Sequence, residues 1–151
     1  MTTFILTISG GIIIFLIGQY ILRFIIEPTI ELKKTFTELS TEILFNLGEI
    51  SSAVSDAEIS LMLRKKSAEI VSKSEAILFY RLSQIFFHLP SKKNIIKAAK
   101  QLNLVSAYMR QEIKEQHKRF GDQVKPIDFA IENVQARQLI SELLKLKTDY
   151  K

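Results

Sequence analysis

The chain of 151 residues contains no cysteine, which excludes a disulfide framework and a thiolate metal site. This absence suits a reducing compartment. Histidine is also scarce, because only His88 and His117 are present. Neither has a second histidine or a carboxylate at the spacing that a helical metal site needs. We therefore expect a structural role for both histidines, and we expect no metal and no other cofactor.

Motifs of catalysis are missing as well. The five glycines are scattered, and three of them lie in the first 22 residues, so there is no glycine-rich phosphate loop. No serine lies in a nucleophile elbow. Glu38 and Glu42 are one helical turn apart, but no adjoining Glu-x-x-His completes a di-iron pattern. The sequence thus favours a protein that is not an enzyme.

Charge is absent from the first 22 residues, and all 21 Lys/Arg and all 16 Asp/Glu lie from Arg23 onward. Between Phe4 and Leu22 there are twelve Ile, Leu or Phe residues. Together they favour insertion into a bilayer by about 4–7 kcal/mol. The 20 residues that end at Leu22 would form a helix about 30 Å long, which matches the hydrocarbon core of a bilayer. The absence of charge therefore predicts a transmembrane helix.

Residues 1–27 are accordingly predicted to be the anchor with its interfacial flank, and residues 28–151 a helical domain. A cleaved signal peptide would need a basic start and a small-residue cleavage site, and a buried core helix is usually amphipathic or shorter. Basic residues follow the apolar segment and none precedes it: Arg23, Lys33 and Lys34. The positive-inside rule then predicts a cytoplasmic domain and an N-terminus outside.

Small residues form a stripe along the anchor. Thr3, Thr7 and Gly11 are spaced by four, and Gly18 follows Gly11 by seven, with Gln19 beside it. Such a stripe lets two spanning helices approach closely, and a glutamine can hydrogen-bond across the contact. The alternative is that glycine and threonine are simply common in spanning helices. Self-association through Thr7, Gly11, Gly18 and Gln19 is therefore a hypothesis.

The periodicity of the remaining chain predicts an all-α fold, with a bundle of four to five helices after the anchor. Proline at 28 predicts a kink or restart there. Helices are expected over residues 28–54, 56–88, 91–102 and 104–120 and from Pro126, with Asp56 or Ser55 and then Ser91 as N-caps. The run AILFYRLSQIFFHL is apolar around much of its circumference, so we expect it to form the centre of the core.

Acidic and basic residues are unevenly placed. Residues 27–58 carry seven acids, and residues 92–125 carry nine bases. The bases considered as a candidate surface are Lys92, Lys93, Lys97, Lys100, Arg110, Lys114, Lys118 and Arg119. They either pair within the bundle and face solvent, or bind an anionic lipid. A nucleic acid ranks last as a partner, because no recognised reader motif accompanies the charge.

Two segments carry a resemblance to known proteins. FLIGQYILRFIIEP at residues 15–28 and LPSKKNIIKAAKQLNLVSAYM at residues 89–109 resemble uncharacterised small bacterial single-span membrane proteins. The resemblance implies a location in the bacterial inner membrane and supplies no activity. Four positions also resemble the first helix of HAMP signalling linkers, although the glycine-containing connector of those linkers is not evident: Pro28, Leu32, Phe36 and Leu39.

The sequence therefore predicts a non-enzymatic, membrane-anchored helical module for interaction or scaffolding. Its expected partners are membrane lipid and either another protein or a second copy of the chain. The alternative function is a peripheral domain that binds anionic lipid or nucleic acid through the basic residues 92–125.

Overall fold

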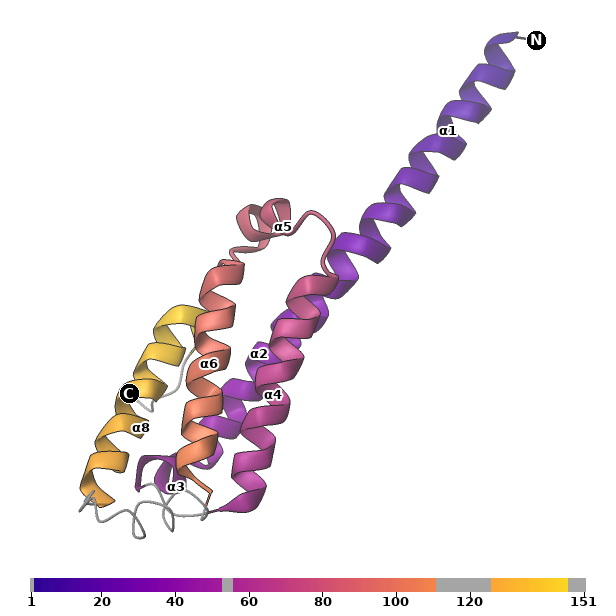
Figure 1. Ribbon diagram of the computed structural model, residues 1–151. Coiled ribbons are helices and arrows are strands. Elements are labelled where there is room, and N and C mark those ends of the chain that lie inside the picture. Colours follow the sequence, from indigo (N-terminus) through magenta and orange to yellow (C-terminus); the bar gives the residue numbers. More distant parts are fainter. Residues whose placement is uncertain (1, 53–55, 111–125, 147–151) are drawn as a thin grey trace.

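The computed structural model describes residues 2–52, 56–110 and 126–146, and every regular element in these ranges is a helix, which confirms the all-α prediction. Figure 1 shows their arrangement. In chain order the elements are α1 (Thr2–Ile21), the π-helix η1 (Leu22–Ile26), α2 (Glu27–Phe45), α3 (Leu47–Ser52), α4 (Ala57–Ala76), α5 (Tyr80–Phe87), α6 (Lys92–Tyr108) and α8 (Pro126–Leu144).

Four long helices, α2, α4, α6 and α8, run alternately down and up to form the bundle (Figure 1). The short α3 closes one end, and α5 lies at the other end, where α1 leaves the bundle. Amphipathic stripes on the four helices meet in one apolar core, as periodic spacing requires. The largest fully buried side chains include Leu32, Leu39, Leu63, Ile70, Ile95, Leu102 and Ile140.

The first helix projects away from the bundle (Figure 1). It continues through η1 into α2, so that Leu6–Phe45 is one helical run of 40 residues. This run contains an apolar stretch long enough to cross a membrane, and none of that stretch is buried against the rest of the chain. The sequence-based prediction of a long apolar N-terminal helix is confirmed.

A new α-helix, α2, begins at Glu27 beside Pro28, as the predicted restart requires, although no loop separates it from η1. Pro28 occupies the first turn of α2, where its missing N–H is tolerated. The turn before it is widened, because the N–H of Glu27 bonds to the carbonyl of Leu22, five residues earlier. Pro28 cannot donate to the carbonyl of Phe24, and this oxygen instead accepts a hydrogen bond from the N–H of Leu78 at 3.3 Å.

Small polar residues bring α4 and α6 together. The hydroxyl of Ser60 donates to the carbonyl of Ser106 at 2.9 Å, and the hydroxyl of Ser106 donates to the carbonyl of Ser60 at 2.7 Å. One heptad further along α4, Ser67 donates to the carbonyl of Ala99 at 3.0 Å. All four residues are buried. Their small volume allows the helix backbones to approach, and the hydrogen bonds satisfy hydroxyls that would otherwise be costly to bury.

Several helix ends match the sequence-based prediction. Asp56 caps α4 by accepting from the N–H groups of Glu58 and Ile59, and Ser91 caps α6 by accepting from Asn94. The last helix begins at Pro126 as expected.

Other predicted boundaries are wrong. The helix expected over residues 28–54 is divided at Asn46, and the helices expected over 91–102 and from 104 are one helix, α6, that runs on to Tyr108. Asn103 is exposed within α6 and does not end it. The remainder of the helix expected to reach residue 120 lies outside the described residues.

The prediction for the apolar run at residues 76–89 is also wrong. The expected helix over 56–88 ends at Ala76, and α5 turns away from the bundle axis. Within the run, Ile77, Tyr80 and Leu89 are buried. The large apolar side chains that are exposed instead of central are Leu78, Phe79, Leu82, Ile85 and Phe86. The run that is apolar around much of its circumference therefore does not form the centre of the core.

Candidate functional site

The outward turn of α5 depends on two residues in the left-handed region of backbone space. α4 ends at Ala76, the backbone of the following Ile77 is extended, and Phe79 then adopts φ 56° and ψ 45°. His88 adopts φ 54° at the other end of α5. This conformation costs a non-glycine residue about 1–2 kcal/mol. Contacts with the surrounding structure must therefore compensate this cost at both ends of α5.

One face of α5 is fixed on the bundle. The hydroxyl of Tyr80 donates to the carbonyl of Pro90 at 2.6 Å, and burial raises the pKa of Tyr80 to about 12, so the phenol stays a neutral donor. The ammonium of Lys92 lies 5.4 Å from the Tyr80 ring centre, and that of Lys33 lies 5.8 Å from the Phe87 ring centre. Both distances fall within cation–π range.

The opposite face of α5 has no cover from the described part of the chain. Leu82, Ile85 and Phe86 share this face at helical spacing and are 49%, 71% and 75% exposed. In the preceding connector, Phe79 is 65% exposed. A contiguous apolar patch of this kind is uncommon on a soluble surface and marks a site of contact with lipid or protein.

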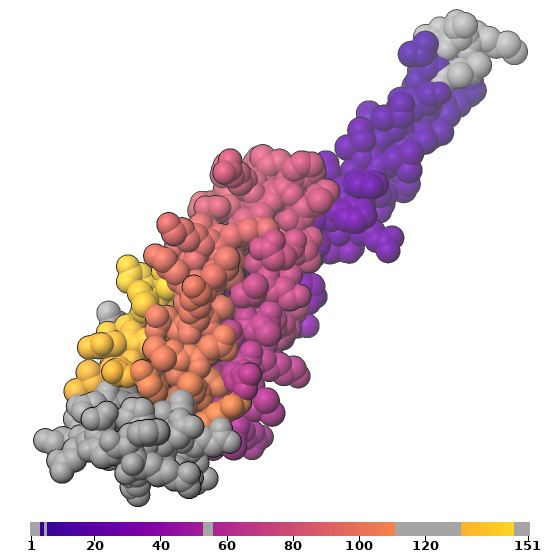
Figure 2. Space-filling view, viewed as in Figure 1, coloured from indigo at the N-terminus to yellow at the C-terminus, as the bar shows by residue number. Residues whose placement is uncertain are grey.

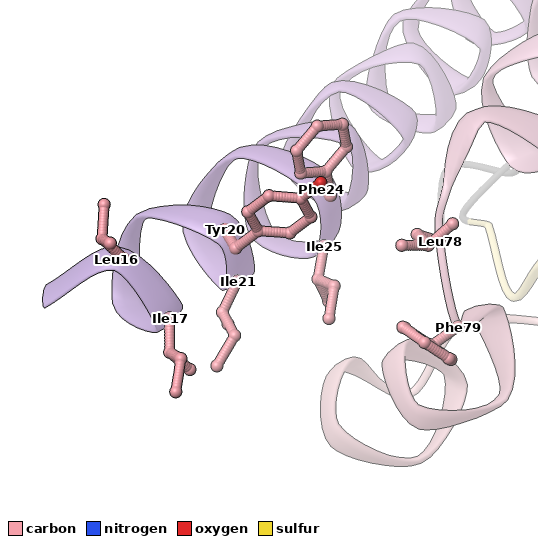
Figure 3. A pocket seen from close by; sticks show the side chains of 8 residues that line it. All are labelled: Leu16, Ile17, Tyr20, Ile21, Phe24, Ile25, Leu78 and Phe79. Carbon is pink, nitrogen blue, oxygen red and sulfur yellow. The ribbon is translucent and has the colours of Figure 1, made fainter. Parts of the chain in front are cut away.

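An apolar groove lies between α1 and this connector (Figure 3). Its volume is about 360 Å³. Figure 3 shows Ile17, Ile21 and Ile25 on one side and Leu78 and Phe79 facing them from the connector. The remaining lining residues are Leu16, Tyr20 and Phe24, and the rings of Tyr20 and Phe24 lie 4.6 Å apart.

Hydrogen-bonding groups are nearly absent from the lining side chains, since only Tyr20 carries one. The groove therefore offers dispersion contacts and burial of apolar area, and it has no side chains arranged to orient a polar substrate. A hydrocarbon chain or an apolar side chain fits this chemistry.

An ion-pair network fixes the helices on either side of the groove, because it joins α2, which continues α1, to α4, which leads into the connector. Lys66 contacts Glu38 at 2.6 Å and Glu69 at 3.4 Å. Lys73 contacts Glu69 at 2.8 Å and Glu31 at 3.6 Å. The hydrogen bond from Lys73 is the largest of the effects that lower the pKa of the Glu69 carboxyl.

The four residues predicted for association of the anchor all lie on α1 and are exposed: Thr7, Gly11, Gly18 and Gln19. No atom lies within 4 Å of the position that a Cβ would take at Gly11 or Gly18. The stripe is thus open to a second helix, and self-association stays a prediction.

The predicted basic residues are distributed along α6. Lys92 and Lys93 begin the helix beside α5, while Arg110 follows its other end, about 27 Å away along the axis. Lys97 and Lys100 lie between them and are exposed. Lys114, Lys118 and Arg119 lie outside the described residues, as does His117. Among the described members of this predicted set, only Lys92 and Lys93 lie at the end of the bundle that carries the groove.

Sequence reasoning did not predict this groove, since none of the four residues predicted for association of α1 lines it, and it also missed the contribution of the connector. The available signal was the apolar run at residues 76–89, because a segment so rich in large apolar side chains is either buried in protein or in contact with membrane. No model of a protein family, no curated protein and no solved structure matches this chain. The resemblance to bacterial single-span proteins therefore stays a prediction.

Replacing His88 tests the strain at the end of α5. We expect His88→Gly to raise the free energy of unfolding by about 0.5–1 kcal/mol, since glycine removes the left-handed penalty but loses more chain entropy on folding. The measurement is chemical denaturation of the full chain in detergent. As a control, Gln84→Gly in the middle of α5 should lower stability by about 1 kcal/mol. A loss of stability in His88→Gly would contradict the left-handed assignment.

Acidification tests the network. The pKa of Glu69 is lowered from 4.5 in the folded chain, so its stabilisation is complete above pH 4.5 and is lost as pH falls through the folded value. We expect Glu69→Gln to lower stability at pH 7 by about 0.5–1 kcal/mol and to flatten the decline below pH 4.5. Denaturation across pH measures both. Glu142→Gln, an exposed α8 residue, should stay within about 0.5 kcal/mol of the parent at pH 7.

Proposed function

We propose that this chain is a non-enzymatic, membrane-anchored helical module that holds its bundle at a membrane surface for interaction with a protein partner or a second copy. α1 spans the inner membrane of a bacterium, the N-terminus lies outside, and the bundle lies in the cytoplasm. The observation that carries this proposal is that the helical run Leu6–Phe45 contains an apolar stretch long enough to cross a membrane. None of that stretch is buried. A lipid environment is the simplest cover for a surface of this length and composition.

The continuity of the run supports a role in holding and positioning. α1 passes through η1 into α2 without a loop, and the network around Lys66 and Lys73 fastens α2 to α4. A flexible linker would let the bundle diffuse around its anchor. A continuous helix instead transmits the orientation of the anchor to the bundle.

Buried polar groups support the non-enzymatic part of the proposal. Ser60, Ser67 and Ser106 donate to backbone carbonyls across the α4–α6 contact. Asn133 on α8 donates to the carbonyl of Ile50 on α3 at 2.9 Å. These groups join helices, which is a structural use of buried hydrogen bonds.

Anionic lipid is a second candidate partner, and the exposed position of Lys93 beside α5 favours it, whereas the ammonium of Lys92 is paired with Glu75 at 2.7 Å. Each basic residue close to an anionic surface contributes about 1 kcal/mol. The described basic residues further along α6 point to solvent along the length of the bundle, so they favour lipid binding less.

Charges placed in the middle of α1 test the anchor. Each lysine at the centre of a spanning helix costs about 2.5–3.5 kcal/mol, so Ile13→Lys with Ile14→Lys should offset the whole insertion energy of about 4–7 kcal/mol. We expect the parent chain to stay in the membrane pellet after a carbonate wash and the double variant to leave it. Leu61→Lys, an exposed apolar site on α4, is the control and should behave as the parent.

Protease treatment tests the orientation in the same membranes. The bundle should be digested in inverted vesicles and protected in intact cells. A parent chain that dissolves without detergent, or a bundle cleaved from outside, would refute the proposed anchor or its direction.

Single cysteines test self-association, because the parent chain has none and every disulfide is then intermolecular. We expect Gly11→Cys and Gly18→Cys to give oxidised dimers in membranes, since both positions are open. Ser9→Cys lies on the opposite side of the helix by its spacing and should stay monomeric. Gel electrophoresis without reductant measures the dimer. Absence of dimers at both glycine positions would exclude this helix contact.

A further inference from the structure

The outward face of α5 and the apolar side of α1 belong to one end of the molecule. Figure 2 shows the atoms of the region around α5 at the end of the bundle from which α1 projects. The face consists of Leu82, Ile85 and Phe86, continued by Leu78 and Phe79 in the connector. The groove joins this face to α1 without an intervening polar side chain other than Tyr20. The exposed apolar residues of the connector therefore adjoin α1, and those of α5 follow directly after them in the chain.

A backbone hydrogen bond fixes the height of this face along the anchor. The N–H of Leu78 donates to the carbonyl of Phe24 at 3.3 Å. Phe24 follows the last residue of the uncharged segment by two positions, and it stacks with Tyr20, an aromatic residue of the kind found at membrane–water boundaries. Leu78 thus lies at the level at which the anchor would leave the hydrocarbon.

The groove extends from this level toward the hydrocarbon. Leu16 lines it eight residues before Phe24, which is about 12 Å along the helix axis. A space of this shape, open on one side and lined by aliphatic and aromatic side chains, matches a segment of acyl chain.

Three basic side chains belong to the elements that meet at this end of the bundle. Arg23 follows the uncharged segment, Arg81 lies on α5, and Lys93 begins α6; all three are exposed. An apolar face bordered by arginine and lysine is the pattern of a helix that lies in the interfacial layer of an anionic membrane.

We propose that the connector and α5 form a second membrane contact in the same leaflet that α1 enters. Leu82, Ile85 and Phe86 lie among the upper acyl segments, the groove between α1 and Phe79 holds part of a lipid chain, and Arg23, Arg81 and Lys93 contact anionic headgroups. This inference rests on the proposed anchor. Two contacts fix the tilt and rotation of the bundle, which a single spanning helix leaves free.

Tryptophan reporters test the contact, since the chain has no tryptophan of its own. Phe86→Trp places the reporter on α5. Phe45→Trp is the matched control, because Phe45 is 83% exposed and lies 21 residues after Phe24, about 30 Å further from the membrane along the helix. Phe15→Trp reports the anchor. Each full-length variant is reconstituted into vesicles of phosphatidylcholine and phosphatidylglycerol, with and without brominated acyl chains.

We expect brominated lipid to quench the tryptophans at positions 15 and 86 and to leave the one at 45 unquenched, with a blue-shifted emission at 86. Quenching at 15 without quenching at 86 overturns the second contact and leaves the anchor intact. A blue shift at 86 without lipid quenching also overturns it, because a protein surface then covers α5. No quenching at 15 refutes the proposed anchor itself.

A second pair of vesicles tests the headgroup contacts. In phosphatidylcholine alone, quenching at 86 should be weaker than in the mixed vesicles, and Arg81→Gln in the Phe86→Trp background should reduce quenching in the mixed vesicles. Equal quenching in every case would overturn the anionic part of the proposal.

Discussion

The missing N–H of Pro28 constrains the whole arrangement. A proline inside a helix leaves the carbonyl four residues earlier without its usual donor. Here that carbonyl belongs to Phe24, and the N–H of Leu78 donates to it from a different part of the chain. The widened turn of η1 makes room for the proline ring, so the helix continues. The connector after α4 is attached to η1 at this point, and the position of α5 follows from it.

The helices of the bundle keep fixed orientations relative to one another, because hydrogen bonds and ion pairs join them in addition to the burial of apolar side chains. Along α4, serines at heptad spacing face α6, and Lys66 and Lys73 contact the carboxylates of Glu38 and Glu31 on α2. Hydrogen bonds between buried small residues specify which faces meet, since a sliding of one helix would leave the hydroxyls without partners. The orientation of α2, and with it that of α1, is thereby coupled to α4 and α6.

The sequence predicts the parts of the fold that depend on local chemistry. The oxygens of Asp56 and Ser91 cap helices by bonding to N–H groups within three residues, so both caps were identifiable. Charge exclusion from the first 22 residues identified the apolar helix. The same reasoning failed at residues 77–79, which contain neither glycine nor proline. The break there depends on the hydrogen bond of Leu78 with Phe24, which joins distant parts of the chain, and on that of Tyr80 with Pro90 across α5.

The two left-handed residues at the ends of α5 hold it in a position that leaves its apolar side chains exposed. The chain has five glycines and places none of them at Phe79 or His88, so both positions retain a conformational cost. A bundle that served only its own stability would bury Ile85 and Phe86 and avoid that cost, since each would contribute about 1.5–3 kcal/mol on full burial. The backbone strain and the exposed apolar side chains are energetically acceptable when another apolar phase covers the exposed face. Because α1 emerges beside that face, the bilayer that would take α1 is the apolar phase within reach.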